Sequence, residues 1–222
     1  FISFRVMTDR KILSGNKIIG IDVGIKNLCT FSDGEKIENP KVFKSFSKSI
    51  IKLNRQLSKK IKKSNNYEKC RIKLARKHEK IRNKRLDFFH KLTNRIVKEN
   101  RIIVIENLRI KNLVRNKKLS KYILDAGWGI FKNVLTYKVN ESTQSKLYLA
   151  DPYFPSTQLC SGCGKKPMSR IKLGTTSWTC VHCGTLHDRD INAAKNIEQL
   201  GRKHDAFLIK KDSSVFLIPS IK

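Results

Sequence analysis

The chain has 222 residues, 39% of them hydrophobic, which is enough for one substantial core and a small satellite unit. Its 48 Lys and Arg against 18 Asp and Glu give a net charge of +30. Because this charge repels itself in a compact fold, it indicates a polyanionic partner that neutralises it, and nucleic acid is favoured over an anionic membrane surface. No apolar stretch approaches the roughly 20 residues of a membrane-spanning helix and no signal peptide opens the chain, so we expect no membrane association. The expected location is the cytoplasm at a prokaryotic nucleoid, or the nucleus in a eukaryotic or viral host.

The first elements are predicted to be strands. Residues 1–14 begin with the alternating segment FISFRV, and we expect this to be the terminal strand of a domain that precedes the chain. After a turn, residues 17–24 form an apolar run that carries Asp22 near its end. Asp33-Gly34 is typical of a hairpin turn and predicts short strands at 28–32 and 35–37.

Residues 41–100 carry much of the charge. They hold 21 Lys and Arg against 4 Asp and Glu, a net charge of +17. Apolar residues at helical spacing stand on both sides of a polar break at 64–66, which predicts a helical hairpin. A solvated helix face is the ordinary explanation of charge, but the dominance of one sign favours a phosphate-binding surface. The predicted nucleic-acid contacts are Arg55, Lys59, Lys60, Lys62, Lys63, Arg76, Lys84 and Arg85, together with Lys165, Lys166 and Arg170 further on.

The second half of the chain returns to an alternating order of strands and helices. Residues 101–106 form an apolar strand that ends in Glu106. A helix with Trp128, Phe131, Leu135 and Val139 on its core face follows, and residues 147–150 read as another buried strand. The run DRDINAAKNI at 188–197 begins a last helix, and the residues after 203 form an uninformative tail.

Four cysteines form two C-x-x-C pairs, Cys160 with Cys163 and Cys180 with Cys183, sixteen residues apart. Disulfides are the alternative, but this spacing is typical of a zinc ribbon, in which four thiolates complete a closed, structural Zn²⁺ site. Because the cysteines saturate the metal, His182 and His187 are interpreted as solvated or DNA-facing, and Trp178 as packed under the metal site. Cys29 and Cys70 fall outside the pattern and are interpreted as ordinary packed thiols.

Three acids occupy corresponding positions, Asp22 and Glu106 at strand ends and Asp190 at a helix start. If the strands are neighbours, the carboxylates converge and repel one another unless divalent cations hold them. Two Mg²⁺ ions would serve phosphodiester hydrolysis. Taken singly, each acid is more often a cap or a solvated charge. Asp190 precedes an amphipathic run, so we expect it to cap the helix and face the sheet edge, whereas Asp188 does neither.

The order of elements and acids describes a ribonuclease H-like fold, and the motifs resemble the RuvC-type nuclease half of transposon-encoded TnpB (OrfB) proteins, relatives of Fanzor proteins and single-RuvC CRISPR effectors. The resemblance covers about residues 15–200. The matching segments are Gly20-Ile21-Asp22-Val23-Gly24 with Asn27-Leu28, Ile105-Glu106-Asn107-Leu108, Asp151-Pro152 through Pro155-Ser156-Thr157, the four cysteines, and DRDINAAKNI.

The resemblance implies that Asp22, Glu106 and Asp190, the second Asp of D-R-D-x-N-A-A, are catalytic. It also implies a guide RNA that reads the DNA target by base pairing. Family members carry an N-terminal half that holds the guide, and we expect this chain to begin at the last strand of that half.

The sequence therefore predicts an α/β protein with a ribonuclease H-like (RuvC) mixed sheet, an inserted basic helical hairpin and an inserted zinc ribbon. The expected nuclease domain covers 15–157 and 188–203 with the hairpin at 41–100, the ribbon covers 158–187, and a tail covers 204–222. The expected function is the nuclease part of an RNA-guided DNA endonuclease. The alternative is a catalytically inactive nucleic-acid-binding relic, or a guide-binding repressor from a decayed transposon. The oligomeric state does not follow from the sequence.

Overall fold

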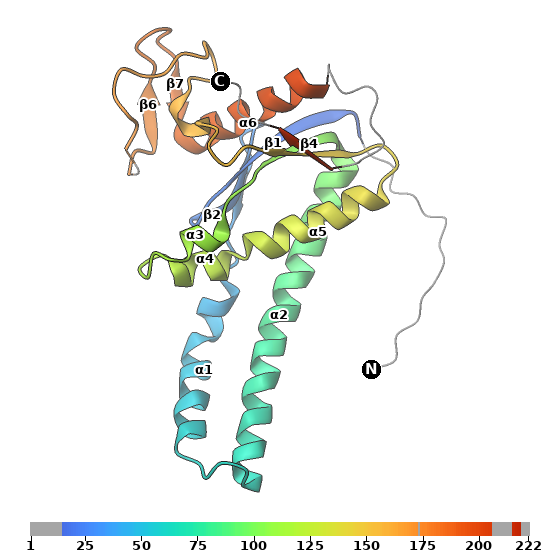
Figure 1. Cartoon of the computed structure of the whole chain (residues 1–222), viewed down its shortest axis with the longest axis vertical. Helices are drawn as coiled ribbons and strands as arrows, with labels where there is room; N and C mark the ends of the chain where they lie inside the picture. The colour runs from blue at the N-terminus through green and yellow to red at the C-terminus, as the bar shows by residue number, and fades with distance from the viewer. Residues whose placement is uncertain (1–14, 173, 206–214, 219–222) are drawn as a thin grey trace.

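The computed structural model describes residues 15–172, 174–205 and 215–218. These residues build a mixed sheet with helices on both faces, and a long helical hairpin projects from one end of it (Figure 1). The strands of the sheet are β1 (Lys17–Val23), β2 (Asn27–Phe31), β3 (Lys36–Glu38), β4 (Asn100–Glu106), β5 (Lys146–Ala150) and β8 (Val215–Ile218). The terminal strand expected within 1–14 lies outside the described residues.

The helices alternate with these strands along the chain. They are α1 (Val42–Ser58), α2 (Asn65–Glu99), α3 (Ile110–Leu113), α4 (Ser120–Ala126), α5 (Trp128–Glu141) and α6 (Arg189–Asp205), with a short 3₁₀ helix η1 (Ser156–Gln158). Strands β6 (Ser177–Thr179) and β7 (Leu186–Asp188) pair as a separate two-stranded sheet. Among the helices of the described residues, none has both the length and the apolar character needed to cross a bilayer.

The strands of the main sheet lie in the order β3-β2-β1-β4-β5-β8. Strands β1, β4, β5 and β8 run parallel, while β2 and β3 form the antiparallel hairpin predicted around Asp33-Gly34. Strand β8 differs from the expected uninformative tail, because residues 215–218 pair with β5. Four residues are too few to show a clear alternation of apolar and polar side chains. The strand is defined instead by its pairing with β5.

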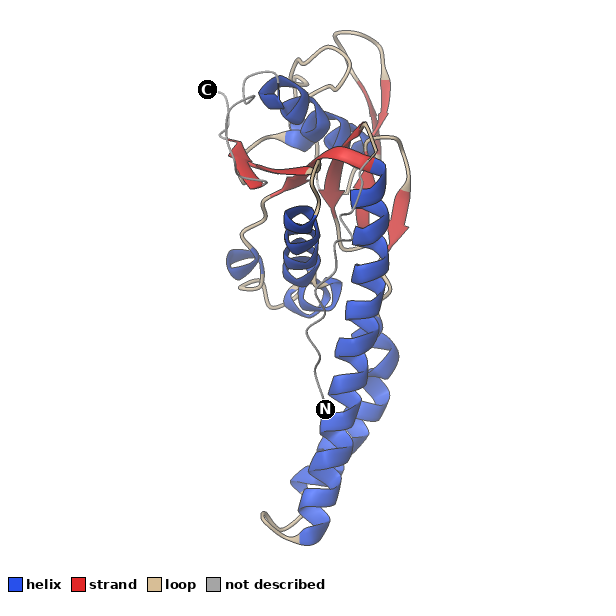
Figure 2. Ribbon diagram, turned by 90° about the vertical axis from the view of Figure 1, so that its right-hand side faces the viewer, coloured by secondary structure: helices blue, strands red, loops and turns tan. Residues whose placement is uncertain are grey.

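Side chains on the two faces of the sheet pack against different helices. On one face Ile103, Ile105 and Leu147 pack against α2 and α5, where Phe89 and Phe131 are fully buried. On the other face Ile102, Val104, Tyr148 and Ala150 pack against Ile197 and Leu200 of α6. Figure 2 shows the sheet between these helices. Because successive strand residues point to opposite faces, the even-numbered residues of β1 and β4 all face α6.

Gly20 explains why α6 can lie so close to β1. A Cβ at Gly20 would collide with the carbonyl oxygen of Ala194 and with the backbone of Glu198, so only glycine allows this approach. The same helix comes against β4 through Gly201, where a Cβ would collide with the side chain of Val104. Two glycines, one in a strand and one in a helix, therefore set the distance between α6 and the sheet.

The hairpin expected at 41–100 is present as α1 and α2, with Ile50 of α1 packed against Ile81 of α2. Ile61 has the helical spacing of this apolar face but lies beyond the end of α1 at Ser58, and it is 83% exposed. Helix α2 begins at the predicted break, where the Ser64 hydroxyl accepts a hydrogen bond from the Tyr67 N–H at 3.1 Å. The expected core face of α5 is confirmed, since Trp128, Phe131, Leu135 and Val139 are all buried.

Candidate active site and cysteine cluster

Asp22 and Glu106 lie side by side at the ends of two neighbouring parallel strands. Ile21 of β1 is paired with Ile105 of β4, and each acid is the next residue of its strand. Both acids are on the face toward α6, because they continue the even-numbered series of β1 and β4. The main sheet therefore brings two carboxylates, 84 residues apart in the sequence, to the same end of its parallel strands.

Asp190, in the first turn of α6, lines the same cleft as these two acids. Its Oδ1 accepts a hydrogen bond from the guanidinium of Arg189 at 3.1 Å. The expectation that Asp190 caps the helix is wrong, because Oδ1 of Asp188 accepts the backbone N–H groups of Asp190 and Ile191, each at 3.1 Å. A side chain just before the first turn can reach those amides, whereas one within the turn points away from them.

The carboxylates of Glu106 and Asp190 act electrostatically on Asp22. Burial holds the pKa of Asp22 well above its usual range, the nearby Glu106 and Asp190 carboxylates raise it further, and Arg189 partly opposes them. Burial raises the pKa of Glu106 to about 7. Carboxylates that are buried close together are neutralised either by protons or by bound cations. The site therefore has the oxygen donors and the charge that a divalent cation such as Mg²⁺ prefers.

These acids line an open cleft of about 1210 Å³. One wall is formed by the ends of β1 and β4 with the start of α6. The other walls come from residues 153–158, which follow the predicted Asp151-Pro152 motif, and from residues 169–172. Arg170 and Lys172 of the last segment are exposed and line the same cleft as Asp22. A strand of nucleic acid in the cleft would meet carboxylates on one side and cations on the other.

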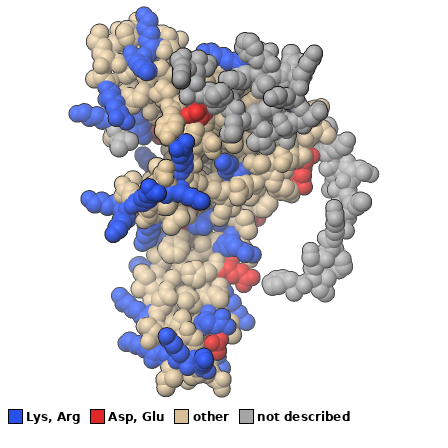
Figure 3. Space-filling model, viewed as in Figure 1, with Lys and Arg blue, Asp and Glu red and all other residues tan. Residues whose placement is uncertain are grey.

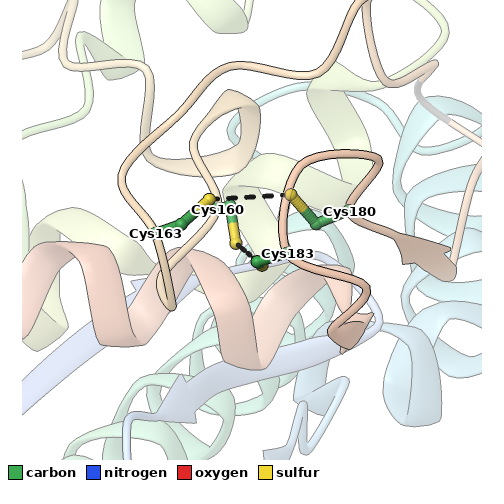
Figure 4. Close-up of side chains that lie close together, drawn as sticks. All are labelled: Cys160, Cys163, Cys180 and Cys183. Atoms are coloured by element: carbon green, nitrogen blue, oxygen red, sulfur yellow. Dashed lines mark hydrogen bonds between the residues drawn. The ribbon is translucent and has the colours of Figure 1, made fainter.

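The four predicted cysteines come together as two facing pairs (Figure 4). Their sulfur atoms all lie within 4.8 Å of one another, with 3.5 Å between Cys160 and Cys183 and 3.7 Å between Cys163 and Cys180. A tetrahedral Zn²⁺ site with bonds of about 2.3 Å places its sulfurs about 3.8 Å apart. The cluster therefore fits a metal such as zinc. Cys29 and Cys70, interpreted as packed thiols, are both buried and reduced.

The surroundings of the cluster favour thiolates at its open side. Hydrogen bonding from the Thr185 hydroxyl, 3.3 Å from Cys183 Sγ, lowers the pKa of that exposed cysteine to about 6. Burial raises the pKa of Cys160 to about 12. Because metals bind the thiolate, Cys183 binds a metal more readily than Cys160 does.

His187 is not solvated as the sequence had suggested. It is buried, its Nε2 lies 3.0 Å from the sulfur of Cys160, and burial lowers its pKa, so a neutral ring can donate one N–H to that sulfur. The ring also packs against Trp178 at 4.8 Å between centroids. Trp178 therefore packs beside the metal site, as interpreted from the sequence. His182 is exposed, with its Nε2 3.2 Å from the Lys166 carbonyl.

Three amide side chains of α6 attach the first cysteine loop to this helix. Asn192, fully buried, donates to the Leu159 carbonyl at 2.7 Å and accepts from the Ser161 N–H at 2.8 Å. The other two, Asn196 and Gln199, donate to carbonyls of the same loop at 2.7 to 2.8 Å. Their spacing of four and three residues places them on one helix face, a signal that a search for polar stripes would have found.

The predicted nucleic-acid contacts are mostly exposed on the hairpin and the ribbon. Figure 3 shows Lys and Arg side chains over much of this face, with few acidic ones among them. Arg55, Lys59, Lys62, Lys63, Arg76, Lys84, Lys165, Lys166 and Arg170 are exposed, and Lys60 is half-buried. Arg85 differs, because it is half-buried and its guanidinium pairs with Asp125 at 3.1 Å. This arginine holds α2 to α4 and does not lie on the open surface.

Family models match both halves of the chain. The model of OrfB_IS605, described as "Probable transposase", matches residues 1–117, and the model "Cas12f1-like, TNB domain" matches residues 128–197. Among solved structures, a Cas12f1 chain from a "Cas12f1-sgRNA-target DNA complex" is similar with a TM-score of 0.55 at 20% identity, over 85% of this chain and 40% of that one. This likeness shows that the mixed α/β fold is shared with Cas12f1.

Curated relatives agree with the family models. A "Putative RNA-guided DNA endonuclease" of Streptomyces pristinaespiralis is 44% identical over 183 residues, which are 82% of this chain and 45% of that protein. The "Putative RNA-guided DNA endonuclease InsQ" of Escherichia coli K12 is 34% identical over 83% of this chain and 49% of its own length. The chain thus spans about half the length of these relatives. Since the OrfB_IS605 model matches more than half of the chain, the protein belongs to the transposon-encoded TnpB (OrfB) family that its motifs resemble.

Proposed function

We propose that this chain is the nuclease part of an RNA-guided DNA endonuclease, with a ribonuclease H-like (RuvC) domain that hydrolyses phosphodiester bonds in DNA. The observation that carries the proposal is the convergence of Asp22, Glu106 and Asp190 on one open cleft. The names of the relatives support DNA and a guide RNA as partners. Such a protein would work where the DNA is, at the nucleoid or in a nucleus.

The division into domains that suits this function coincides with the boundaries of the helices and strands. The nuclease domain would comprise 15–157 with α6, the hairpin 41–100 would be an insert within it, and 158–187 would form the ribbon. The exposed cations of the hairpin and of the ribbon would bind phosphates without reading sequence, which leaves base pairing to the guide. Arg85 is left out of this surface because of its pairing with Asp125.

Asp22, Glu106 and Asp190 would hold the catalytic Mg²⁺. The raised pKa values of Asp22 and Glu106 and the oxygen donors of all three acids suit that ion, because a divalent cation offsets the cost of burying negative charge and the repulsion between like charges. Two bound Mg²⁺ ions would supply a water of lowered pKa and neutralise charge on the leaving oxygen, the chemistry of phosphodiester hydrolysis. Arg189 would orient the Asp190 carboxylate. Arg170 and Lys172 would draw the phosphate backbone into the cleft.

The four cysteines would hold a structural Zn²⁺. The sulfur spacing fits a closed tetrahedral shell, and a closed shell has no position for substrate. Cys160, Cys163, Cys180 and Cys183 would then organise the loop that carries the basic residues beside the cleft. Their place next to α6 would link metal binding to the position of Asp190.

The test is Mg²⁺-dependent cleavage of single-stranded DNA, and of guide-matched duplex, by the Asp22→Ala, Glu106→Ala and Asp190→Ala variants. Each should reduce cleavage to background while DNA binding is kept, and combining them should cost nothing more, because one missing ligand already disables the site. Asp188→Ala is the matched control, since this acid caps α6. Normal cleavage by Asp190→Ala with loss in Asp188→Ala would overturn the assignment. Absence of cleavage by the parent chain under all these conditions would favour a non-catalytic binding protein.

A further inference from the structure

The side chain of Gln158 forms two hydrogen bonds with one distant residue. Its Nε2 donates to the Ile171 carbonyl at 3.1 Å, and its Oε1 accepts the Ile171 N–H at 2.9 Å. A primary amide that bonds both backbone groups of one residue imitates the pairing between two strands. Each polar atom of Gln158 is therefore already engaged, although the residue lines the cleft.

The residue that Gln158 holds lies between two cations. Arg170 and Lys172 flank Ile171, both are exposed, and both line the cleft that contains Asp22 and Asp190. In the described part of the chain neither side chain forms an ion pair. We call residues 169–172 the cation segment. Its charges are available to a ligand in the cleft.

Among the described residues, few other hydrogen bonds hold the cation segment. It belongs to the long loop between the two cysteine pairs, where the nearest backbone hydrogen bond joins the Thr175 N–H to the Lys172 carbonyl at 3.1 Å. Within the described residues, no other hydrogen bond joins 167–172 to the nuclease body than the two of Gln158. Ordering one residue costs about 1–2 kcal/mol of conformational entropy, so two hydrogen bonds can decide whether this segment stays in place.

We propose that Gln158 is a positioning residue that fixes the cation segment across the cleft from the carboxylates, so that Arg170 and Lys172 meet the phosphates of an entering strand. The inference rests on the proposed function only in that a nucleic-acid strand enters this cleft. Gln158 itself does not touch that strand. Its amide sets where the two cations stand, and a preordered pair of cations binds phosphates at a lower entropic cost than a loose one.

The first measurement is hydrogen–deuterium exchange of the cation segment in the 222-residue chain with its zinc content verified. Gln158→Ala should speed exchange at the Ile171 amide, because that N–H loses its acceptor. Gln158→Glu keeps an acceptor for the N–H but sets a carboxylate against the Ile171 carbonyl, so it should also loosen the segment. Gln199→Ala is the matched control, since it removes a bond of the same kind to the Ser161 carbonyl, 2.8 Å away, outside the cleft.

The second measurement is binding of a mixed-sequence single-stranded oligonucleotide of about six nucleotides, a size that engages few phosphates, with Ca²⁺ in place of Mg²⁺. Its place in the cleft is checked by protection of the amides of 153–158. Two lost phosphate contacts lower the slope of log affinity against log salt by about 1.4 on a single strand. Gln158→Ala and the double variant Arg170→Ala/Lys172→Ala should each lower the slope by nearly this amount, and Gln199→Ala should leave the slope unchanged.

Combining Gln158→Ala with Arg170→Ala/Lys172→Ala separates positioning from other roles. If Gln158 acts through the two cations, its removal changes neither affinity nor salt slope once they are gone. An unchanged salt slope in Gln158→Ala despite faster exchange at Ile171 would overturn the proposal, as would a further loss in the combined variant. Because binding is measured without cleavage, a chain that never cuts DNA would refute the proposed nuclease and leave this result intact.

Discussion

Asp188 and Asp190 stand two residues apart at the start of α6, and their carboxylates point to different partners. Asp188 accepts two backbone N–H groups of the helix and pairs with Lys36 of β3 at 2.7 Å. Asp190 lies in the cleft beside Asp22 and takes its hydrogen bond from Arg189. One acid therefore joins the helix to the sheet, while its neighbour lines the cleft.

Asp188→Ala should lower the free energy of unfolding by about 1 kcal/mol, the usual effect of losing an N-cap, with a small addition for the partly exposed pair with Lys36. Asp190→Ala should leave stability unchanged or raise it, because it relieves repulsion with Asp22. Urea unfolding of both variants is the measurement. Asp188→Asn, which keeps the capping oxygen, should recover most of the loss, and equal destabilisation by both alanines would contradict this division.

Stability should depend on pH through Glu106. Its pKa in the folded chain is about 7 against an ordinary 4.5, so the folded state binds more protons than the unfolded state between these values. Glu106 therefore lowers the stability measured without added Mg²⁺ as pH rises from 4.5 to 7, by about 3 kcal/mol at most. Glu106→Gln should be more stable than the parent at pH 8, and the difference should shrink toward pH 5.

Thermal unfolding of the parent and of Glu106→Gln across this range is the measurement. Glu38→Gln is the control, because it replaces an exposed carboxylate of β3 with an amide. Added Mg²⁺ should raise the melting temperature of the parent at pH 8 and leave that of Glu106→Gln nearly unchanged. A constant difference between parent and variant at every pH would show that Glu106 is not the titrating group.

Asn192 should matter to the cysteine loop more than its size suggests. Asn192→Ala leaves the half-buried Ser161 N–H without its acceptor, which costs about 1 kcal/mol. Since that N–H lies between Cys160 and Cys163, we expect faster loss of Zn²⁺ to a chromogenic chelator as well. Gln199→Ala removes an exposed bond to the same loop and should change both quantities little. Equal zinc release from both variants would mean that the loop does not depend on Asn192.

Asp125 fastens the hairpin to the rest of the molecule. Its two carboxylate oxygens accept the Phe43 and Lys44 N–H groups at the start of α1, at 2.8 and 3.1 Å, and one also pairs with Arg85 of α2. The side chains of Asp125 and Arg85 are 9% and 15% exposed, so Asp125→Ala leaves a largely buried guanidinium unpaired and should cost about 3–5 kcal/mol.

The matched control is Asp87→Ala, which breaks the exposed pair with Lys91 and should cost under about 1 kcal/mol. Asp125→Ala combined with Arg85→Met should be more stable than Asp125→Ala alone, because no unpaired charge then stays buried. Urea unfolding measures all three. A double variant no more stable than Asp125→Ala would show that the helix cap, and not the ion pair, carries the effect.

Several features could be predicted from local pattern. The four cysteines were identified as a metal site by spacing alone, because zinc ribbons bring together two cysteine pairs that each have two residues between their members. The strands with Asp22 and Glu106, and the buried face of α5, followed from apolar periodicity. Asp125 as the cap of α1, the buried place of His187 and the strand β8 could not be predicted, since each partner is brought by chain folding from far away in sequence.

The sequence by itself determined the elements, the metal-binding thiols and the candidate acids, because hydrophobic period, cysteine spacing and residue chemistry are local properties of the chain. Only the tertiary structure decided that Asp188, and not Asp190, caps α6. It also decided that Arg85 forms its ion pair with Asp125, and that Gln158 binds Ile171 beside the cleft. These outcomes depend on the direction of a side chain relative to a second segment. That direction is set by the packing of α6 and the loops against the sheet, where the closest approach requires a glycine at position 20.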